Sequence, residues 1–359
     1  MFQTDIAKQA IMIDGINYSQ EELKHITKER SNSFSDFHFE VFRFLNEWFD
    51  GSEWITIQTS GSTGKPKPLI VRKAHMIQSA CITCTYFDFQ PKDKVLLCLP
   101  LSYIAGKMMV VRALVASLDL YPINPSGNPL KETNLEFRFA SMVPLQIYNT
   151  LQNHNEKQRL FKIGALLIGG SAIDPELEKT LKDFPNPVYA SYGMAETLSH
   201  IALRRLNGAE ASLNYVPFPS VSISLSSENT LIIDAPLICS EKLYTNDIAE
   251  IFPDGNFRIL GRKDNVIITG GLKVQIETLE ATLREFIKTP FAVSSLPDNK
   301  FGEIIVLAVV NQIDESLLSE NLPSWQKPKR IIRINAIPLT KSGKINRAAL
   351  KQMLMGDNN

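Results

Sequence analysis

A run of hydroxyl, glycine and lysine residues at positions 59–67 directly follows a short β-rich run, Trp54–Gln58. Glycines let the backbone turn tightly and expose its N–H groups, and nearby hydroxyl and ammonium groups add donors and positive charge, so such a loop can hold a polyphosphate. It is not a P-loop, because only two residues separate its glycines and proline follows Lys65. From composition alone, a flexible hydroxyl-rich loop is an equally good interpretation. The candidate phosphate-binding residues are Thr59, Ser60, Gly61, Ser62, Thr63, Gly64 and Lys65.

Two glycine-containing segments, Ile168–Ala172 and Tyr192–Thr197, also follow predicted strands, the place where open α/β sheets put their ligand sites. In the second segment, Glu196 could hold Mg²⁺, which proteins often bind through one or two carboxylates plus substrate phosphates. A solvated glutamate is the alternative. In the first segment, close backbone approach to a flat ring and a plain turn both fit. The candidates here are Gly169, Gly170, Ser171, Tyr192, Gly193, Glu196 and Thr197.

Three further motifs lie in the last third of the chain. Asp247 ends a Tyr-Thr-Asn-Asp run and offers a carboxylate for sugar hydroxyls, and Gly261-Arg262-Lys263-Asp264 follows it. Lys344, within Thr340–Arg347, stands next to a glycine and could reach a distant site, although a basic solvated turn is the usual interpretation of such a run.

The composition is that of an ordinary globular protein. The chain has 359 residues with 38 basic and 38 acidic side chains, so its formal charge is 38 − 38 = 0 and nucleic acid is not an expected partner. The sequence shows no secretion signal and no apolar window near the ~20 residues of a membrane span, so we expect a cytoplasmic enzyme without membrane contact. Cys81 and Cys84 form a C-x-x-C without a second pair at metal spacing, which favours buried thiols.

Short β-rich runs alternate with longer helical ones over most of the chain, a pattern typical of a mainly parallel sheet covered by helices. Alternating runs from about Ser220 predict a small antiparallel sheet, and a compact α+β unit follows. We place the boundary at Lys263 or Asp264, giving domains 1–263 and 264–359. The predicted strands are Trp54–Gln58, Val95–Cys98, Ala165–Ile168, Val188–Ala190, Val266–Thr269, Phe291–Leu296, Ile304–Val310 and Arg330–Ile334. The predicted helices are Ala74–Phe87, Ile104–Leu118, Val143–Leu151, Pro175–Leu181, Ile276–Phe286 and Glu315–Leu322.

The order of these motifs is more specific than any one of them. The series TSGSTGKPK, GGS, YGMAET, Y-T-x-D, GRKDN, TGG and PLTKSGKINR, from Thr59 to Arg347, resembles the acyl-adenylate-forming superfamily. This superfamily comprises acyl- and aryl-CoA ligases, peptide-synthetase adenylation domains and luciferases. The resemblance implies an α/β fold with a large N-terminal adenylation core and a small mobile α+β C-terminal domain. It also implies ATP, Mg²⁺, CoA and a small carboxylic acid as ligands.

The resemblance also assigns roles. The hydroxyl-rich loop is similar to the pyrophosphate-binding loop of the family, Tyr192 and the Gly169–Ser171 segment to its adenine pocket, and Glu196 to its Mg²⁺ ligand. Thr197 takes the position of an α-phosphate contact. In the C-terminal third, Asp247 and Arg262 take the positions of ribose contacts, Lys344 that of the lysine of the adenylation step, and Lys263 or Asp264 that of the hinge.

The chemistry explains why such groups are needed. A carboxylate repels nucleophiles, so the family first makes it attack the α-phosphorus of ATP, which gives an acyl-adenylate and pyrophosphate. Two anions must meet, and Mg²⁺ together with the ammonium of Lys344 can stabilise that charge. In the family, the CoA thiol attacks in a second step, for which the small domain rotates, and the resemblance implies that this rotation brings the loop at Gly270-Gly271 to the reaction centre.

The acid pocket carries a further resemblance. Leu99–Gly106 matches a family motif, with Tyr103 where many relatives have His. A basic residue six positions after Gly106, together with Ser141–Gln146, resembles the o-succinylbenzoate–CoA ligases of menaquinone synthesis, whose substrate has two carboxylates. Arg112 is the candidate partner of the carboxylate that is not activated. A helix-surface arginine that snorkels is the alternative.

Other candidates for the acid pocket are less specific. His200 either lines the pocket or is an ordinary partly buried histidine, and Lys107 is expected at the surface. A ligase for another aromatic or medium-chain acid, an adenylation enzyme that loads a carrier protein, and a nucleotide-binding pseudoenzyme all remain open. So does the oligomeric state, a homodimer included.

Three departures from the family pattern accompany the resemblance. The phosphate loop usually comes much later in the chain, so we expect a reduced outer subdomain with only a few helices and a strand before residue 50. Asn246 replaces a glycine and should be tolerated, because Asn also accepts left-handed dihedrals. Leu272 and Lys273 depart from the commoner residues of the thiolation loop.

Overall fold

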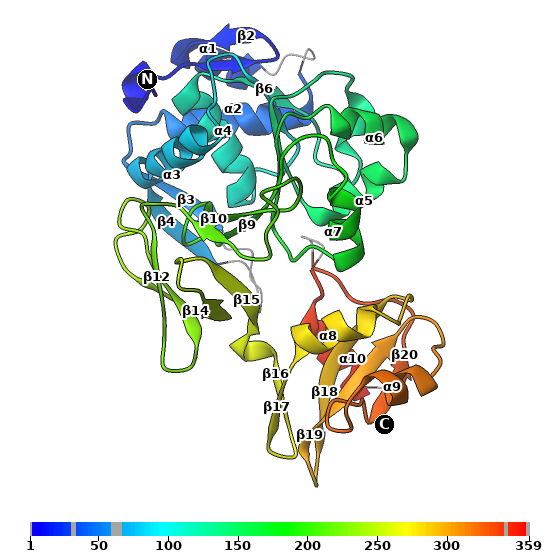
Figure 1. The fold of residues 1–359 in the computed structure, drawn as a ribbon. Coiled ribbons are helices and arrows are strands. Elements are labelled where there is room, and N and C mark those ends of the chain that lie inside the picture. Colours follow the sequence, from blue (N-terminus) through cyan, green and yellow to red (C-terminus); the bar gives the residue numbers. More distant parts are fainter. Residues whose placement is uncertain (1, 30–33, 59–66, 341–343, 357–359) are drawn as a thin grey trace. The chain divides into compact units, whose positions relative to one another are not determined.

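The computed structural model describes residues 2–29, 34–58, 67–340 and 344–356. They form two compact units. The first contains the described residues up to Ser222 together with Asp234–Leu243, and the second contains Ile223–Ile233 together with the described residues from Tyr244 onward. Figure 1 labels many of the helices and strands of both units.

A nine-stranded sheet forms the centre of the first unit, in the order β11-β10-β9-β8-β7-β5-β6-β1-β2. The strands from β9 to β1 along this order pair in parallel, whereas β2, β10 and β11 are antiparallel to their neighbours. The bounds are β1 Ile11–Ile13, β2 Ile16–Tyr18, β5 Lys94–Leu97, β6 Asp119–Pro122, β7 Phe139–Met142, β8 Leu166–Ile168, β9 Val188–Gly193, β10 His200–Arg205 and β11 Val216–Pro217.

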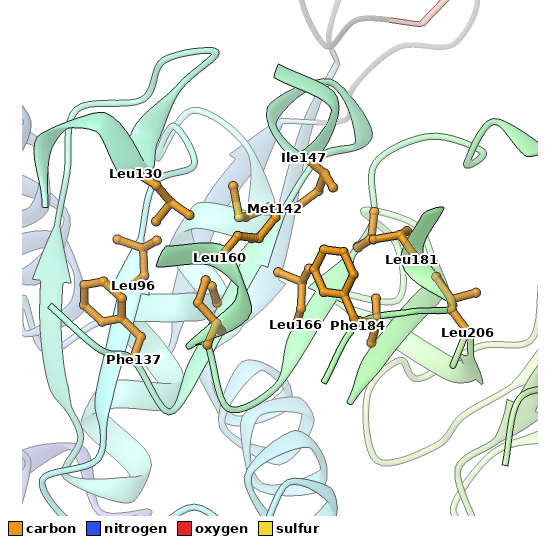
Figure 2. Packing of buried hydrophobic residues seen from close by; sticks show 14 of the residues in the cluster. Leu96, Leu130, Phe137, Met142, Ile147, Leu160, Leu166, Leu181, Phe184 and Leu206 are labelled. Carbon is orange, nitrogen blue, oxygen red and sulfur yellow. The ribbon is translucent and has the colours of Figure 1, made fainter. Parts of the chain in front are cut away.

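Helices cover both faces of this sheet. Ala140 and Met142 of β7 face a core that contains buried side chains of α5, α6 and α7 (Figure 2). Because neighbouring residues of a strand point to opposite faces, Phe139 lies on the other side, where its ring is 4.8 Å from that of Phe87 at the end of α3. The helices are η1 Ile6–Lys8, α1 Gln20–Glu29, α2 Asp36–Trp48, α3 Lys73–Tyr86, α4 Ile104–Ala116, η2 Pro129–Glu132, α5 Pro144–Leu151, α6 His154–Phe161 and α7 Pro175–Leu181.

Local sequence signals set several helix ends. Asp174 caps α7 by accepting a hydrogen bond from the backbone N–H of Glu176 at 3.0 Å, and Pro175 occupies the first turn, where its missing N–H costs nothing. Helix α4 ends at Ser117, which is left-handed at φ 53°. At the start of α4, Gly106 packs so closely that a Cβ there would lie 2.5 Å from the carbonyl oxygen of Pro100.

Two smaller sheets lie outside the central one. Strands β3 (Trp54–Gln58) and β4 (Pro68–Arg72) form an antiparallel pair. Four strands form a sheet in the order β12-β13-β14-β15, in which Asp247 of β14 pairs directly with Arg262 of β15. The bounds of these four strands are β12 Ser222–Leu225, β13 Thr230–Asp234, β14 Leu243–Ile251 and β15 Phe257–Arg262.

The C-terminal part of the second unit is a five-stranded sheet with a core on each face. Helices α8 and α9 contribute to one core, and Leu350 and Leu354 of α10 contribute to the other. The carboxylate of Glu280 on α8 accepts hydrogen bonds from the guanidinium of Arg347 at 2.9 and 3.1 Å and from the backbone N–H of Val293. The elements are η3 Lys263–Asn265, β16 Val266–Thr269, β17 Leu272–Gln275, α8 Ile276–Arg284, β18 Phe291–Asp298, β19 Gly302–Val309, α9 Ser316–Asn321, β20 Arg330–Arg333 and α10 Arg347–Gly356.

The predicted fold class is confirmed: a largely parallel sheet between helices, a small antiparallel sheet and an α+β C-terminal part. The compact units group much of the small antiparallel sheet with the C-terminal residues. The division at 263 and 264 concerns a hinge motion and stays a prediction. In the part of the chain that the structure describes, no helix is both long and apolar enough to cross a bilayer.

Candidate active site

The predicted phosphate loop, Thr59–Lys65, lies outside the described residues. Strand β3, which ends at Gln58, is confirmed directly before it. The second predicted segment, Gly169–Ser171, follows β8, which lies between β7 and β9 in the parallel part of the sheet. A Cβ on Gly169 would lie 2.4 Å from the hydroxyl oxygen of Ser191, and Gly170 has a φ of +86°. A side chain at position 169 would have to displace the Ser191 hydroxyl, and glycine at position 170 accommodates a left-handed turn.

The Tyr192–Thr197 segment leaves the end of β9 in a tight turn. A Cβ on Gly193 would lie 2.2 Å from the carbonyl oxygen of Ser199, so the two ends of the turn touch through glycine. The hydroxyl of Thr197 is buried, accepts from the N–H of Met194, and lies 3.0 and 2.7 Å from the carbonyl oxygens of Met194 and Ser199, which share its single proton. Thr197 therefore pins this turn, and its contact with an α-phosphate stays a prediction.

Glu196 stands at the tip of the same turn, and its side chain is exposed. Mg²⁺ keeps several waters and is commonly held by one or two carboxylates together with substrate phosphates. A single exposed carboxylate at the end of a parallel strand fits that donor set. Tyr192, the predicted adenine contact, is partly buried on β9. The centroid of its ring lies 5.8 Å from that of Tyr215.

Arg112 is buried on α4, with 2% of its surface exposed, so the snorkelling alternative is wrong. One Nη donates to the hydroxyl of Ser199 at 2.5 Å, and the other contacts the sulfur of Met109 at 3.5 Å. The Nε–H has no hydrogen-bond partner in the part of the chain that the structure describes. Burial lowers the pKa of Arg112 to about 10, so the guanidinium is charged at pH 7 and is poorly compensated.

The other predicted acid-side residues lie on elements next to Arg112. His200 is buried at the start of β10 and contacts Ser199 and Thr83. Tyr103 is the residue before α4 and is partly buried. Lys107 is not a surface lysine: its ammonium donates to the carbonyl oxygen of Thr56 at 3.1 Å, and burial lowers its pKa.

The two cysteines of the C-x-x-C, Cys81 and Cys84, both lie on α3. Burial raises the pKa of Cys84 to about 12 and also raises that of Cys81. Thiols with raised pKa values in a packed helix are poor nucleophiles and poor metal ligands. The buried-thiol interpretation of the C-x-x-C therefore holds for Cys84, whereas Cys81 is only partly buried.

In the second unit, an ion-pair network joins the predicted ribose and hinge residues. The guanidinium of Arg262 donates to Asp247 at 3.0 Å and to both carboxylate oxygens of Asp264 at 2.8 Å. The hydrogen bond with Arg262 lowers the pKa of Asp264, and the hydrogen bond with Asp264 raises the pKa of Arg262. Lys263 pairs with Glu228. Both hinge candidates thus sit in charge pairs on a short 3₁₀ turn, which a hinge motion would have to accommodate.

Lys344 belongs to the same unit and is partly buried. Burial lowers the pKa of its ammonium, the charge of Arg262 lowers it further, and the charge of Asp247 opposes both. These long-range effects connect Lys344 with the two predicted ribose residues. Asp247 and Arg262 offer an acceptor and donors of the kind that sugar hydroxyls use.

Sequence reasoning missed Ser199 and Thr83. Ser199 comes two residues after the recognised Y-G-M-A-E-T segment, and Thr83 lies in the apolar pattern of α3. The hydrogen bonds that involve them join residues 87 and 117 positions apart. The one sequence signal that pointed to such residues was Arg112 in an apolar helix, since a buried guanidinium needs hydrogen-bond acceptors.

The family described as AMP-binding enzyme matches residues 4–235. The chain belongs to this family. It is similar to the 2-succinylbenzoate–CoA ligase of Listeria monocytogenes serovar 1/2a, with 26% identity over 342 residues that cover 86% of this chain and 72% of the relative.

Two solved structures are also similar. An acyl-CoA synthetase (AMP-forming)/AMP-acid ligase II-like protein from Dyadobacter fermentans has 32% identity and a TM-score of 0.62, with coverage of 92% of this chain and 98% of that chain. The o-succinylbenzoate coenzyme A synthetase of Bacillus subtilis, in complex with ATP and magnesium, has a TM-score of 0.69 at 19% identity and covers 93% of this chain and 82% of its own. At that identity, the second likeness shows the fold alone.

Proposed function

We propose that this protein is an AMP-forming ligase that adenylates 2-succinylbenzoate with ATP and Mg²⁺ and transfers the acyl group to CoA. The family, the named relative and the ordered nucleotide motifs support the reaction type. The family and the ordered nucleotide motifs also support ATP as the co-substrate, and the exposed carboxylate of Glu196 supports Mg²⁺ as the metal. ATP and CoA are intracellular, which supports the cytoplasmic location that we expect from the sequence.

Arg112 is the observation that favours an acid with two carboxylates. Burying a guanidinium without an opposite charge beside it costs on the order of several kcal/mol of folding free energy. Arg112 has its Nε–H unpartnered and its Nη1 on a thioether sulfur, which is a weak acceptor. A substrate carboxylate beside this edge of the guanidinium would supply the missing charge and a strong acceptor. The ring carboxylate of 2-succinylbenzoate, which is not activated, meets that need.

The remaining groups divide the work of adenylation. Glu196 would hold Mg²⁺, which neutralises phosphate charge as the acid attacks. Tyr192 and the Gly169–Ser171 backbone would bind the adenine, and Asp247 and Arg262 the ribose. Lys344 would then stabilise the oxygens around the reacting phosphorus. For thioester formation, rotation at Lys263 or Asp264 would withdraw Lys344 and admit the CoA thiol.

A product assay tests this function. Purified protein is incubated with ATP, Mg²⁺, CoA and an acid panel that includes 2-succinylbenzoate, and nucleotide and thioester are identified by mass. We expect AMP and 2-succinylbenzoyl-CoA. Glu196→Gln should lower the rate, whereas Glu210→Gln, at an exposed glutamate of the same unit, is the matched control. Formation of ADP instead of AMP would refute adenylation, and thioester with other acids only would refute the substrate.

A further inference from the structure

A series of hydrogen bonds connects Arg112 with residues in the protein interior. The hydroxyl of Ser199 contacts the Nη2 of Arg112 at 2.5 Å and the Nδ1 of His200 at 3.1 Å. On the other side of the imidazole ring, Nε2 is 3.2 Å from the hydroxyl of Thr83. That hydroxyl contacts the carbonyl oxygen of Ser79 at 3.1 Å, one turn back on α3. This series of hydrogen bonds thus connects α4, the start of β10 and α3.

One assignment of protons satisfies every member of this chain. Thr83 donates its only hydroxyl proton to the carbonyl oxygen of Ser79, which leaves its oxygen to accept from Nε2–H of His200. The Nδ1 of His200 then accepts from the hydroxyl of Ser199, whose oxygen is free to accept from Arg112. If Nδ1 carried the proton instead, the Ser199 oxygen would accept from two donors, and the Ser199 proton would lose His200 as its acceptor. The contacts therefore favour the neutral Nε2–H tautomer, in which each proton of this network has an acceptor.

The backbone around Ser199 is shaped for these contacts. Leu198 adopts a left-handed φ of 62°, which is unfavourable for a branched side chain. The pairing of β9 with β10 shifts register between His200 and Ala202. Bulges of this kind re-aim a side chain. Gly193 lets the carbonyl of Ser199 approach β9 closely. Three local departures from regular structure thus meet where Ser199 and His200 turn toward Arg112.

The imidazole of this hydrogen-bond network is buried. His200 is 6% exposed, and the ring of Phe218 lies 5.5 Å from its imidazole. Burial, and then the charge of Arg112, hold the pKa of His200 well below its usual range, so the ring is neutral at pH 7. A neutral ring adds no positive charge beside the guanidinium. It can therefore fix the direction of Ser199 without repelling Arg112.

We propose that Ser199, His200 and Thr83 form a positioning relay that holds the guanidinium of Arg112 in one orientation and thereby sets the preference for an acid with a second carboxylate. This inference rests on the proposed function for its substrate. The relay touches no reacting atom, so its loss should weaken discrimination between acids and leave the activation chemistry intact.

The first test compares two acids in two variants of Thr83. 2-Succinylbenzoate carries the ring carboxylate, and 3-benzoylpropionate lacks it. We expect Thr83→Val to lower kcat/KM for the diacid by about tenfold, through KM, because one buried hydrogen bond is lost and Arg112 is less well ordered. The monoacid should change by less than about twofold, and Thr83→Ser should restore the diacid preference.

Thr150→Val is the matched control. Thr150 is also a fully buried threonine, on α5, and its hydroxyl has no hydrogen-bond partner among the residues that the structure describes. This substitution should leave the ratio of the two acids unchanged. Equal losses for both acids in Thr83→Val would show a merely structural role and overturn the relay.

The second test does not depend on the substrate. The chain has five histidines, so ¹⁵N-histidine labelling gives five ring systems, and His200→Gln identifies the signal of His200. At pH 7 we expect a neutral ring protonated on Nε2. A ring protonated on Nδ1, or a charged ring, would overturn the relay. If the wild type activates neither acid, the proposed substrate is wrong. The tautomer of His200 then tests the hydrogen-bond relay independently of the substrate.

Discussion

Replacement of Lys344 by alanine should separate the two half-reactions of the proposed mechanism. The backbone of this residue is held independently of its side chain: the N–H of Thr340 donates to the carbonyl oxygen of Lys344 at 2.7 Å, and the N–H of Lys344 donates to the hydroxyl of Thr340 at 3.1 Å. Leu339 and Ile345 form an antiparallel bridge beside these contacts. Lys344→Ala therefore removes an ammonium group and leaves its backbone support in place.

The size of the effect follows from that local change. One preorganised electrostatic contact to a developing oxyanion contributes about 3–4 kcal/mol, so adenylation should slow by at least about a hundredfold. Pyrophosphate release measures this step. A supplied 2-succinylbenzoyl-adenylate should still be converted to thioester at close to the wild-type rate. Lys288→Ala, at an exposed lysine of the same unit, is the control. An equal fall in both half-reactions would refute the two-conformation account.

The pH dependence of adenylation tests the electrostatics around Lys344. Burial and Arg262 lower the pKa of Lys344, so the ammonium is lost as pH rises through a value below that of an ordinary lysine. Adenylation at saturating ATP should fall correspondingly early on the alkaline side. Arg262→Gln removes one lowering influence and should move this limb to higher pH, although ATP then binds more weakly. An unmoved limb would contradict the proposed coupling.

Three further substitutions test buried features. Arg112→Met should lower kcat/KM for 2-succinylbenzoate by about a hundredfold, since truncating one partner of a buried charge pair costs about 2–5 kcal/mol, and should spare 3-benzoylpropionate. Gly193→Ala should lower the thermal midpoint and the activity, because its Cβ would meet the carbonyl of Ser199 at 2.2 Å. Arg347→Met leaves Glu280 buried and unpaired, so urea unfolding should show a loss of about 3–5 kcal/mol, and adding Glu280→Gln should recover part of it.

Much of the fold could be predicted where local signals and periodicity agree. The predicted helix Pro175–Leu181 and strand Val266–Thr269 match α7 and β16 residue for residue, because a cap or a turn marks each end. Strands β10 and β11 were missed. His200–Leu203 is buried without alternation, and the two-residue Val216–Pro217 exists only through its pairing with β10. Both strands are defined by antiparallel pairing in the order β9-β10-β11, which the pattern of apolar residues within each segment does not reveal.

The residue types of the candidate site could be predicted from the sequence, whereas the hydrogen bonds between them could not. The resemblance of this region to o-succinylbenzoate–CoA ligases implied a carboxylate partner for Arg112, and burial of this side chain agrees with that idea. The contacts with Ser199 depend on a left-handed Leu198, a conformation that no propensity predicts for leucine. The tertiary structure alone shows that the chain segment after the Y-G-M-A-E-T motif supports the arginine.

One turn therefore links the two sides of the proposed reaction. Glu196 at its tip is the proposed magnesium ligand, and Ser199 three residues later contacts the proposed acid-binding Arg112. Thr197 lies between them, with its hydroxyl bonded to both ends of the turn. Because these contacts hold the backbone on each side of Thr197, a shift of Glu196 would be coupled to a shift of Ser199. We therefore expect Thr197 to be needed for the proposed reaction through its support of this turn, apart from the predicted contact with the α-phosphate.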